Sequence, residues 1–181
     1  QWLVDSYLCT DGKPINESPL YNQAKPFENR DPRLRMSLIV PGDWFGGIKF
    51  ETHPDSVQTF MLTGSTNTRI GNQEVTNPFA TFTGYLWRKN CDETQFTAPY
   101  NGGTMPFKLI RYAEILLVYA EAKMELNQID KSAIDAFNLV RRRVQMPDLV
   151  AGITQTEFRR LLRLERKVEL AGEGKRLFDI R

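Results

Sequence analysis

The spacing of apolar residues changes near residue 107, and this change constrains the fold more than any other feature. Residues 107–128 read FKLIRYAEILLVYAEAKMELNQ. On a helix, the polar residues of this stretch fall on one narrow strip: Arg111, Glu114, Glu121 and Glu125. A helix that is apolar over the rest of its circumference is usually packed on more than one side. We therefore predict a helix here with neighbours on several sides.

Two more helices are predicted after this one. Residues 131–144 carry apolar residues at helical spacing, and Pro147 ends that helix. Thr154 and Glu157 fit a capping box that starts a third helix. The first two helices, from Ala113 to about Pro147, resemble one tetratricopeptide unit. A single unit cannot bury both of its faces, so the pattern predicts neighbouring helices.

The first 106 residues have a different composition. They hold nine of the ten prolines and many glycine-containing turns, such as VPGD and WFGG. Short strands are predicted at Leu34–Val40, Ser56–Leu62 and Thr83–Lys89. The predicted fold class is mainly α, with tetratricopeptide-like helix pairs and an irregular, loop-rich region that carries short strands. Residues 1–106 would form the irregular region and residues 107–181 the helical part.

Charge and cysteine content exclude several functions. The 24 basic and 22 acidic residues nearly cancel, which gives no reason to expect nucleic acid or an anionic membrane as a partner. No apolar run approaches the ~20 residues that span a bilayer. Cys9, Cys91 and the single histidine, His53, lack metal-ligand spacing, so we predict no metal and no cofactor. The two cysteines could form a disulfide or stay as buried thiols.

The stretch ELAGEGKRLFDIR, residues 169–181, could be a phosphate-binding loop or a helix end. A Walker loop requires Gly at position 169 and Ser or Thr at position 176, where this chain has Glu169 and Arg176. A helix end explains Gly172 and Gly174 directly, because glycine adopts the left-handed conformation that terminates helices. The sequence therefore favours the helix end.

Glu165 and Glu169 lie on the apolar stripe of the third helix. They could be the acid/base pair of a glycoside hydrolase. Nearby arginines would keep both carboxylates ionised, however, and we predict that they form ion pairs, with Arg111 and Arg176 as the leading partners. The run of arginines at 141–143 is interpreted as a solvated helix end.

Aromatic residues in loops are the candidate ligand contacts. Trp44 and Phe45 lie in PGDWFGG, and Trp87 lies near another loop. Exposed aromatic rings stack on sugar rings or dock protein partners. The alternative is that these rings pack the irregular region onto the helices.

Several motifs together resemble the SusD/RagB family. RYAEILLVYAEA at 111–122 and ERKVELAGEGKRLFDIR at 165–181 are similar to two helices of its carboxyl-terminal region. DGKPI at 11–15, NRDPRL at 29–34 and TGYLWRK at 83–89 fit the family in the same order. In this resemblance Arg111, Glu165, Glu169, Glu173 and Arg176 match scaffold positions, and we expect Asp179 to join their ionic network.

The resemblance implies a surface-exposed outer-membrane lipoprotein of Bacteroidetes-type bacteria. Such proteins bind glycans or other nutrients without catalysis and deliver them to a SusC-like TonB-dependent transporter. The membrane contact would run through a lipid anchor absent from this chain, which is expected to be part of one larger SusD-like domain. The alternatives are a tetratricopeptide-type protein–protein scaffold and, third, a glycoside hydrolase.

Overall fold

A computed structural model describes residues 1–78, 80–95 and 105–180 of the chain. The chain forms two compact units. One comprises residues 1–34 and 108–181, and the other comprises residues 35–107. The sequence grouped residues 1–106 into one loop-rich region, whereas in the structure the first 34 residues pack with the helices.

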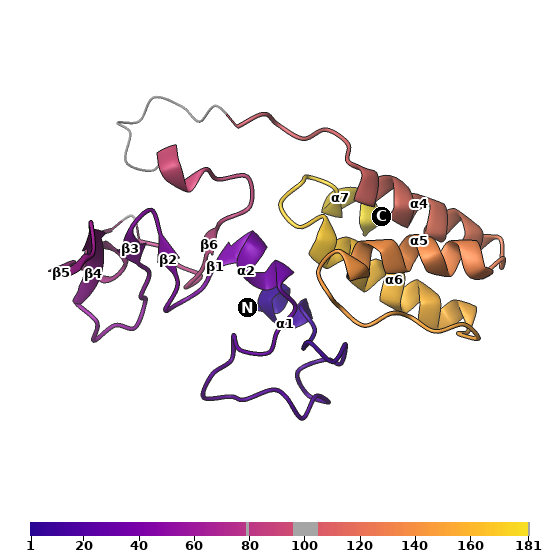
Figure 1. Ribbon diagram of the computed structural model, residues 1–181, viewed down its shortest axis with the longest axis horizontal. Coiled ribbons are helices and arrows are strands. Elements are labelled where there is room, and N and C mark those ends of the chain that lie inside the picture. The colour runs from indigo at the N-terminus through magenta and orange to yellow at the C-terminus, as the bar shows by residue number, and fades with distance from the viewer. Residues whose placement is uncertain (79, 96–104, 181) are drawn as a thin grey trace. The chain divides into compact units, whose positions relative to one another are not determined.

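Three helices form the body of the first unit. These are α4 (Tyr112–Glu125), α5 (Lys131–Arg142) and α6 (Gln155–Glu169), which lie side by side (Figure 1). Two short helices, α1 (Trp2–Ser6) and α7 (Arg176–Asp179), belong to the same unit. The helices predicted from the apolar periodicity are confirmed, although α4 begins later and α5 ends earlier than the pattern suggested.

The core of this unit consists of apolar side chains from all three long helices. Its buried members are Leu117, Ala120, Met124, Ala133, Ile134, Ala136, Phe137, Val140, Phe158 and Leu162. Phe137 and Phe158 meet edge to face, with 5.6 Å between their ring centroids. Small alanines beside large aromatic rings allow the helices to approach closely, as the tetratricopeptide-like pattern predicts.

The helix ends follow local signals in the sequence. The Thr154 side chain accepts a hydrogen bond from the Glu157 amide and so caps α6. The carboxylate of Glu157 binds Arg160 on the next turn. After α6, Gly172 and Gly174 have φ angles of 75° and 73°. The helix-end interpretation of the glycine-containing stretch is therefore confirmed.

Helix α4 buries only one of its faces. Leu117, Ala120 and Met124 are in the core, whereas Ile115 and Val118 are exposed. Within the described residues, the prediction that this helix packs on more than one side is therefore wrong. Its apolar residues encircle the helix, but α5 and α6 approach from one side, so the other side has no cover within this part of the chain.

The first 34 residues are held mainly by hydrogen bonds from one buried arginine. The Arg30 guanidinium donates to the carbonyl oxygens of Val4 and Tyr7, both at 2.7 Å, and to that of Pro26 at 2.8 Å. An isolated antiparallel bridge joins Cys9 to Arg30. This segment therefore has a defined path even though α1 is its only helix before residue 33.

The second unit contains two small antiparallel sheets. In the four-stranded sheet the order is β2 (Trp44–Phe45), β3 (Ile48–Lys49), β4 (Gln58–Thr63) and β5 (Thr66–Gly71). The other sheet pairs β1 (Leu38–Ile39) with β6 (Leu86–Trp87). The unit also contains the short helix α3 (Gln73–Thr76) and the 3₁₀ turn η1 (Glu93–Gln95), and α2 (Arg33–Ser37) spans the boundary between the units.

The predicted strands are only partly correct. The strand at Ser56–Leu62 is confirmed as β4, and that at Thr83–Lys89 shrinks to the two residues of β6. The strand predicted at Leu34–Val40 is wrong over its first half, which forms α2. Leu34 and Leu38 are both buried and lie four residues apart, a spacing that also suits one helical turn.

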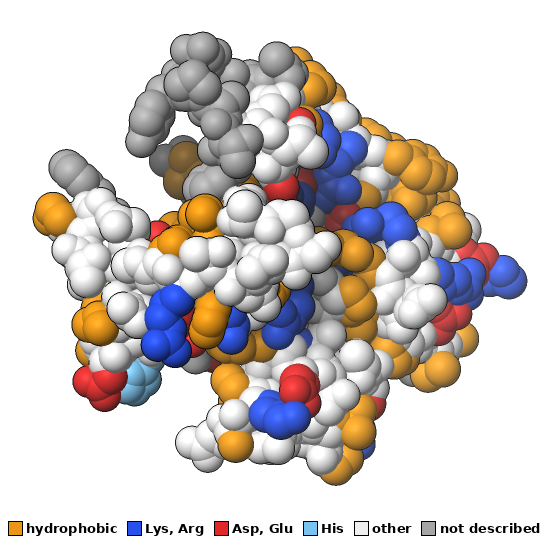
Figure 2. All heavy atoms as spheres, turned by 60° about the vertical axis from the view of Figure 1, so that its left-hand side comes forward, with side chains coloured by type: hydrophobic (Ala, Val, Ile, Leu, Met, Phe, Trp, Pro, Cys, Tyr) orange, Lys and Arg blue, Asp and Glu red, His pale blue; other side chains and the backbone are white. Residues whose placement is uncertain are grey.

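The surface carries acidic and basic side chains in close alternation (Figure 2). The pale-blue imidazole of His53 lies beside an acidic side chain, and Asp55 is 3.8 Å from it (Figure 2). Neither charge sign dominates this face, which agrees with the near-zero net charge. None of the helices within the described residues is both long and apolar enough to cross a bilayer.

Both cysteines are free thiols. Cys9 is buried, whereas Cys91 is exposed. The disulfide is therefore not formed, and the expectation that both thiols would be buried holds only for Cys9. A buried thiol next to the Arg30 bridge acts as a small apolar side chain.

Candidate functional site

Trp44 and Phe45 lie on a tight hairpin in the second unit. They form β2, and the turn Gly46–Gly47 leads directly into β3, so that Trp44 pairs with Lys49 and Phe45 with Ile48. Both glycines have positive φ angles, 55° and 78°. A two-residue turn of this kind requires left-handed backbone at both positions, which glycine adopts without steric cost.

Adjacent residues of a strand point to opposite faces, and the two rings of β2 differ accordingly. Trp44 is 39% exposed, whereas Phe45 is half-buried and lines a cavity. The prediction treated both rings as one exposed apolar face. The structure separates them into an outward indole and an inward phenyl ring.

Trp87 belongs to the same unit and lies on β6, opposite Leu38. It is 48% exposed, while the preceding residue, Leu86, lines the cavity. The next residue, Arg88, donates a 2.7 Å hydrogen bond to the Trp44 carbonyl oxygen and places its guanidinium 5.7 Å from the Phe45 ring centroid. Arg88 thus links the two aromatic segments. We call Trp44, Phe45 and Trp87 the aromatic surface.

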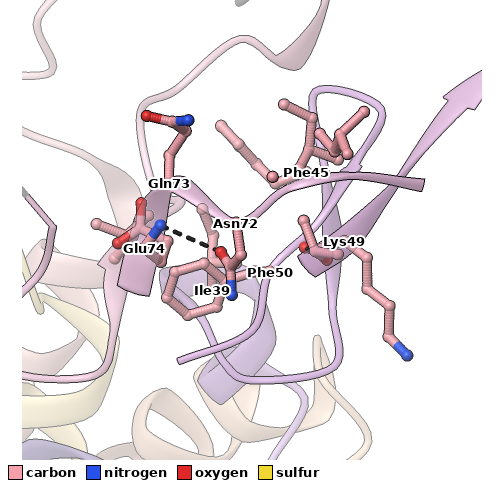
Figure 3. Close-up of a pocket in the computed structure, with 12 residues that line it drawn as sticks. Ile39, Phe45, Lys49, Phe50, Asn72, Gln73 and Glu74 are labelled. Atoms are coloured by element: carbon pink, nitrogen blue, oxygen red, sulfur yellow. Dashed lines mark hydrogen bonds between the residues drawn. The ribbon is translucent and has the colours of Figure 1, made fainter. Parts of the chain in front are cut away.

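The cavity beside the aromatic surface has a volume of about 190 Å³. Its walls include Ile39, Phe45 and Phe50, with Asn72 at one edge (Figure 3). The buried Asn72 amide donates to the carbonyl oxygens of Glu51 and Ser56 and accepts from the Glu74 amide at 3.1 Å. The Lys49 side chain extends away from the cavity (Figure 3).

The size and polarity of this cavity limit what it can hold. Ligand pockets usually measure about 300–1,000 Å³, so this one is small. Asn72 directs its amide to protein backbone, and a ligand rich in hydroxyl groups would lose hydrogen bonds on entering an apolar space. The cavity suits an apolar group, whereas the outward indoles of Trp44 and Trp87 suit the flat face of a sugar ring.

The predicted ionic residues are in the first unit, where a buried network forms around α6. Glu165 and Glu169 are each only 2% exposed. The Arg33 guanidinium donates to both carboxylates and forms a fork-to-fork pair with Asp31. Arg141 lies 3.4 Å from Glu165, and Arg143 lies 3.0 Å from Glu169. The network therefore joins residues 31–33 to α6 and to the end of α5.

Arg111 connects the network to the start of α4. It is the extended residue just before the helix, and its guanidinium donates to the Glu169 carboxylate at 2.8 Å and to Glu173 at 2.7 Å. A third hydrogen bond, of 2.6 Å, reaches the Glu169 carbonyl oxygen at the end of α6. The expected association of Arg111, Glu169 and Glu173 is what the structure shows.

Other predicted members of the network lie elsewhere. Within the described residues, Arg176 forms no ion pair, and its guanidinium lies 5.5 Å from the Trp2 ring centroid. Asp179 binds Arg166 at 2.6 Å, on the opposite side of α6 from the core carboxylates. Arg176 follows Gly174, which turns the chain, so its side chain leaves the region of Glu165 and Glu169.

The run of arginines at 141–143 is not simply a solvated helix end. Arg141 is buried and donates to the Pro147 carbonyl oxygen and to Glu165. Arg142 is exposed and binds Asp148, while Arg143 reaches Glu169. Consecutive helical residues point about 100° apart, so the three arginines serve three different partners. The sequence analysis missed Arg33, Arg141 and Arg143 as members of the network.

The network keeps the Glu169 carboxylate ionised. Burial alone would raise its pKa, but hydrogen bonds from Arg111 and the charge of Arg33 outweigh burial and lower the pKa below its ordinary value of 4.5. The stabilisation by this group is therefore complete above the unfolded-state pKa and is lost as the pH falls through the lower folded-state pKa.

These electrostatics do not fit an acid/base pair for glycoside hydrolysis. That reaction requires one carboxylic acid whose pKa is raised so that it can donate a proton. The pKa of Glu169 is lowered, and Glu165 is enclosed by Arg33 and Arg141. Within the described residues, no group of three His, Cys, Asp or Glu side chains is arranged to hold a metal ion.

Comparison with known proteins assigns the family. The whole chain, residues 1–181, matches the sequence model of the SusD family. Seventy-nine residues are 37% identical to SusD-like protein P2 of Formosa agariphila, over 40% of this chain and 16% of that protein. The chain therefore belongs to the SusD family.

Solved structures show the same fold. A SusD-like carbohydrate-binding protein from Bacteroides fragilis superimposes with a TM-score of 0.74 at 32% identity, over 98% of this chain and 34% of that one. A second SusD-like protein from this species gives a TM-score of 0.71 at 27% identity, over 99% of this chain and 34% of that one. The predicted fold class is confirmed, and the chain spans about a third of the length of these structures.

Replacing Glu165 by Gln tests the structural role of the network. The substitution leaves Arg33 and Arg141 buried with less negative charge, and we expect the free energy of unfolding to fall by about 3–5 kcal/mol. Urea denaturation followed by far-UV circular dichroism measures this change. Glu157→Gln is the matched control on the same helix, because it breaks an exposed pair worth about 0–1 kcal/mol. Equal losses in the two variants would contradict a buried network.

Proposed function

We propose that this protein binds a glycan or another nutrient at the bacterial cell surface without catalysing a reaction. Its SusD-family membership supports this proposal, as does the similarity to a protein named for carbohydrate binding. The observation that carries it is the aromatic surface, where the Trp44 and Trp87 indoles are exposed on short strands. Strands hold the rings in place, so little conformational freedom is lost when a sugar ring stacks on them.

The aromatic surface also explains how such a protein binds without reacting. The exposed indoles offer apolar faces, and the nearby Arg88 is committed to the Trp44 carbonyl oxygen and the Phe45 ring. The carboxylates that could have served as acid and base are in the ionic network of the other unit. The binding surface and the buried carboxylates therefore belong to different units of the chain.

The further steps of the proposed function concern location and delivery. We place the protein at the outer membrane, exposed at the surface and anchored by lipid, where it passes its ligand to a SusC-like TonB-dependent transporter. Family membership supports this placement. The even mixture of surface charges gives no alternative attraction to nucleic acid or to an anionic membrane (Figure 2).

A protein–protein scaffold is the second candidate function. It is favoured by the exposed apolar face of α4, with Ile115 and Val118, on a tetratricopeptide-like helix pair. Tetratricopeptide arrays commonly bind other proteins on such helices. The two functions differ in what they require of the aromatic surface, because a scaffold acting through α4 does not use Trp44.

Trp44→Ala tests the aromatic surface as the nutrient site. In the full-length protein, we expect the variant to bind a responsive glycan about two- to tenfold more weakly, because one stacking contact is lost. Isothermal titration against a glycan panel measures the affinity. Phe82→Ala, at a residue 99% exposed in the same unit, is the control and should bind like the wild type. Unchanged affinity in Trp44→Ala would remove this contact from the site.

Co-purification tests the delivery step. We expect the tagged full-length protein, extracted from outer membranes with mild detergent, to retain a TonB-dependent transporter encoded by a neighbouring gene. The transporter is identified by mass spectrometry, and an unrelated surface lipoprotein carrying the same tag serves as control. Recovery of other partners in its place would favour the scaffold function.

A further inference from the structure

A cluster of cations surrounds the indole of Trp2, at a place that neither the aromatic surface nor the ionic network uses. Trp2 lies on α1, Arg163 and Lys167 lie on α6, and Arg176 lies on α7. The Lys167 ammonium is 3.0 Å from the Trp2 ring centroid, and the Arg176 guanidinium carbon is 5.5 Å from it. All belong to the first unit.

These side chains line an open pocket of about 410 Å³. Its walls include Trp2, Arg163, Lys167 and Arg176, together with Asp179 and Ile180. The volume falls within the range of about 300–1,000 Å³ that is typical of small-molecule sites. The pocket is therefore about twice the volume of the apolar cavity beside Phe45, and cationic groups surround it.

The acidic groups near this pocket leave its cations unneutralised. Asp179 is engaged by Arg166, which donates to it at 2.6 Å and 2.9 Å. Asp5, on α1, accepts a 2.7 Å hydrogen bond from Gln1. Within the described part of the chain, neither Arg163, Lys167 nor Arg176 forms an ion pair with a carboxylate. The Lys167 ammonium instead donates to the Ser6 hydroxyl.

The closeness of the cations has a measurable electrostatic consequence. Burial, and then the charge of Arg176, lower the pKa of Lys167 to about 8, while the charge of Asp5 opposes this only in part. Two positive groups that share one indole in partial burial repel each other. A negatively charged ligand between them would relieve this repulsion and stabilise the charged form of Lys167.

We propose that the pocket around Trp2, Lys167 and Arg176 binds an oxyanion group, a carboxylate or a sulfate, carried on a small organic ligand. Arginine presents a planar fork that matches the oxygens of such groups, and lysine adds a point charge beside it. The pocket is larger than an oxyanion alone, and Trp2 and Ile180 provide apolar surface for the remainder of the ligand. This proposal does not depend on nutrient binding at Trp44.

The test uses the full-length protein with ¹³C-labelled lysine, in which the Lys167 signal is followed by NMR. Inorganic sulfate and glucuronate are titrated at constant ionic strength, with glucose as the uncharged counterpart of glucuronate. We expect both anions to shift the Lys167 signal in a saturable way, to compete with each other and to raise its pKa, because the bound form favours the proton. No shift with either anion, or an equal shift with glucose, would overturn the proposal.

Two variants separate binding from a structural role. Arg176→Gln should weaken the binding of both anions by about tenfold or more, since a charge-assisted hydrogen bond is lost, and should raise the pKa of Lys167 in the free protein. Lys131→Gln removes an exposed cation on α5 and should leave both quantities unchanged. Equal effects of the two substitutions would show that general surface charge, not this pocket, attracts the anions.

The pH dependence provides an independent readout. Sulfate and glucuronate stay ionised between pH 7 and pH 9, whereas Lys167 loses its proton as the pH rises through about 8. Affinity in the wild-type protein should therefore fall across this range. In Lys167→Gln it should be weaker and nearly independent of pH, because the arginines stay charged. Far-UV circular dichroism checks that this variant is folded, and an unaltered pH dependence in the folded variant would exclude Lys167 from the site.

Discussion

One guanidinium group, that of Arg33, determines how the first unit of this protein is assembled. It comes from an irregular segment near the start of the chain, yet it donates to two carboxylates on α6 that are more than 130 residues away. Four arginines and four acids form the complete network, which also reaches Arg111 before α4 and Arg143 after α5. Because buried charges are costly unless they are paired, this interaction allows residues 1–34 to pack with the helices.

Local features of the fold were predictable where a short-range signal exists. The periodicity of apolar residues located α5 and α6, and the capping threonine and the glycines marked the ends of α6. Leu34–Val40 was misread because alternating apolar residues can also satisfy one helical turn. The exposed side of α4 could not be foreseen, since the spacing of apolar residues reports how apolar a helix is and does not show which elements cover it.

Long-range pairings set the limit of prediction at the sites. Two carboxylates on an apolar stripe showed that cationic partners were needed, but Arg33 and Arg176 are equally plausible partners until the chain is folded. Trp44 and Phe45 were found from their glycine-flanked loop, whereas the opposite orientations of the two rings follow from strand pairing. Trp2 and Lys167 lie more than 160 residues apart, and no local pattern relates them.

The ionisation of Glu169 tests the account most directly. If the carboxylate belongs to a buried scaffold of arginines, a ¹³C NMR titration of its side-chain carboxyl group in the folded protein should give a pKa below the ordinary value of 4.5. The carboxylate should then stay ionised throughout the neutral range. A pKa well above the ordinary value would contradict the scaffold, and it would restore this pair of glutamates as candidates for acid catalysis.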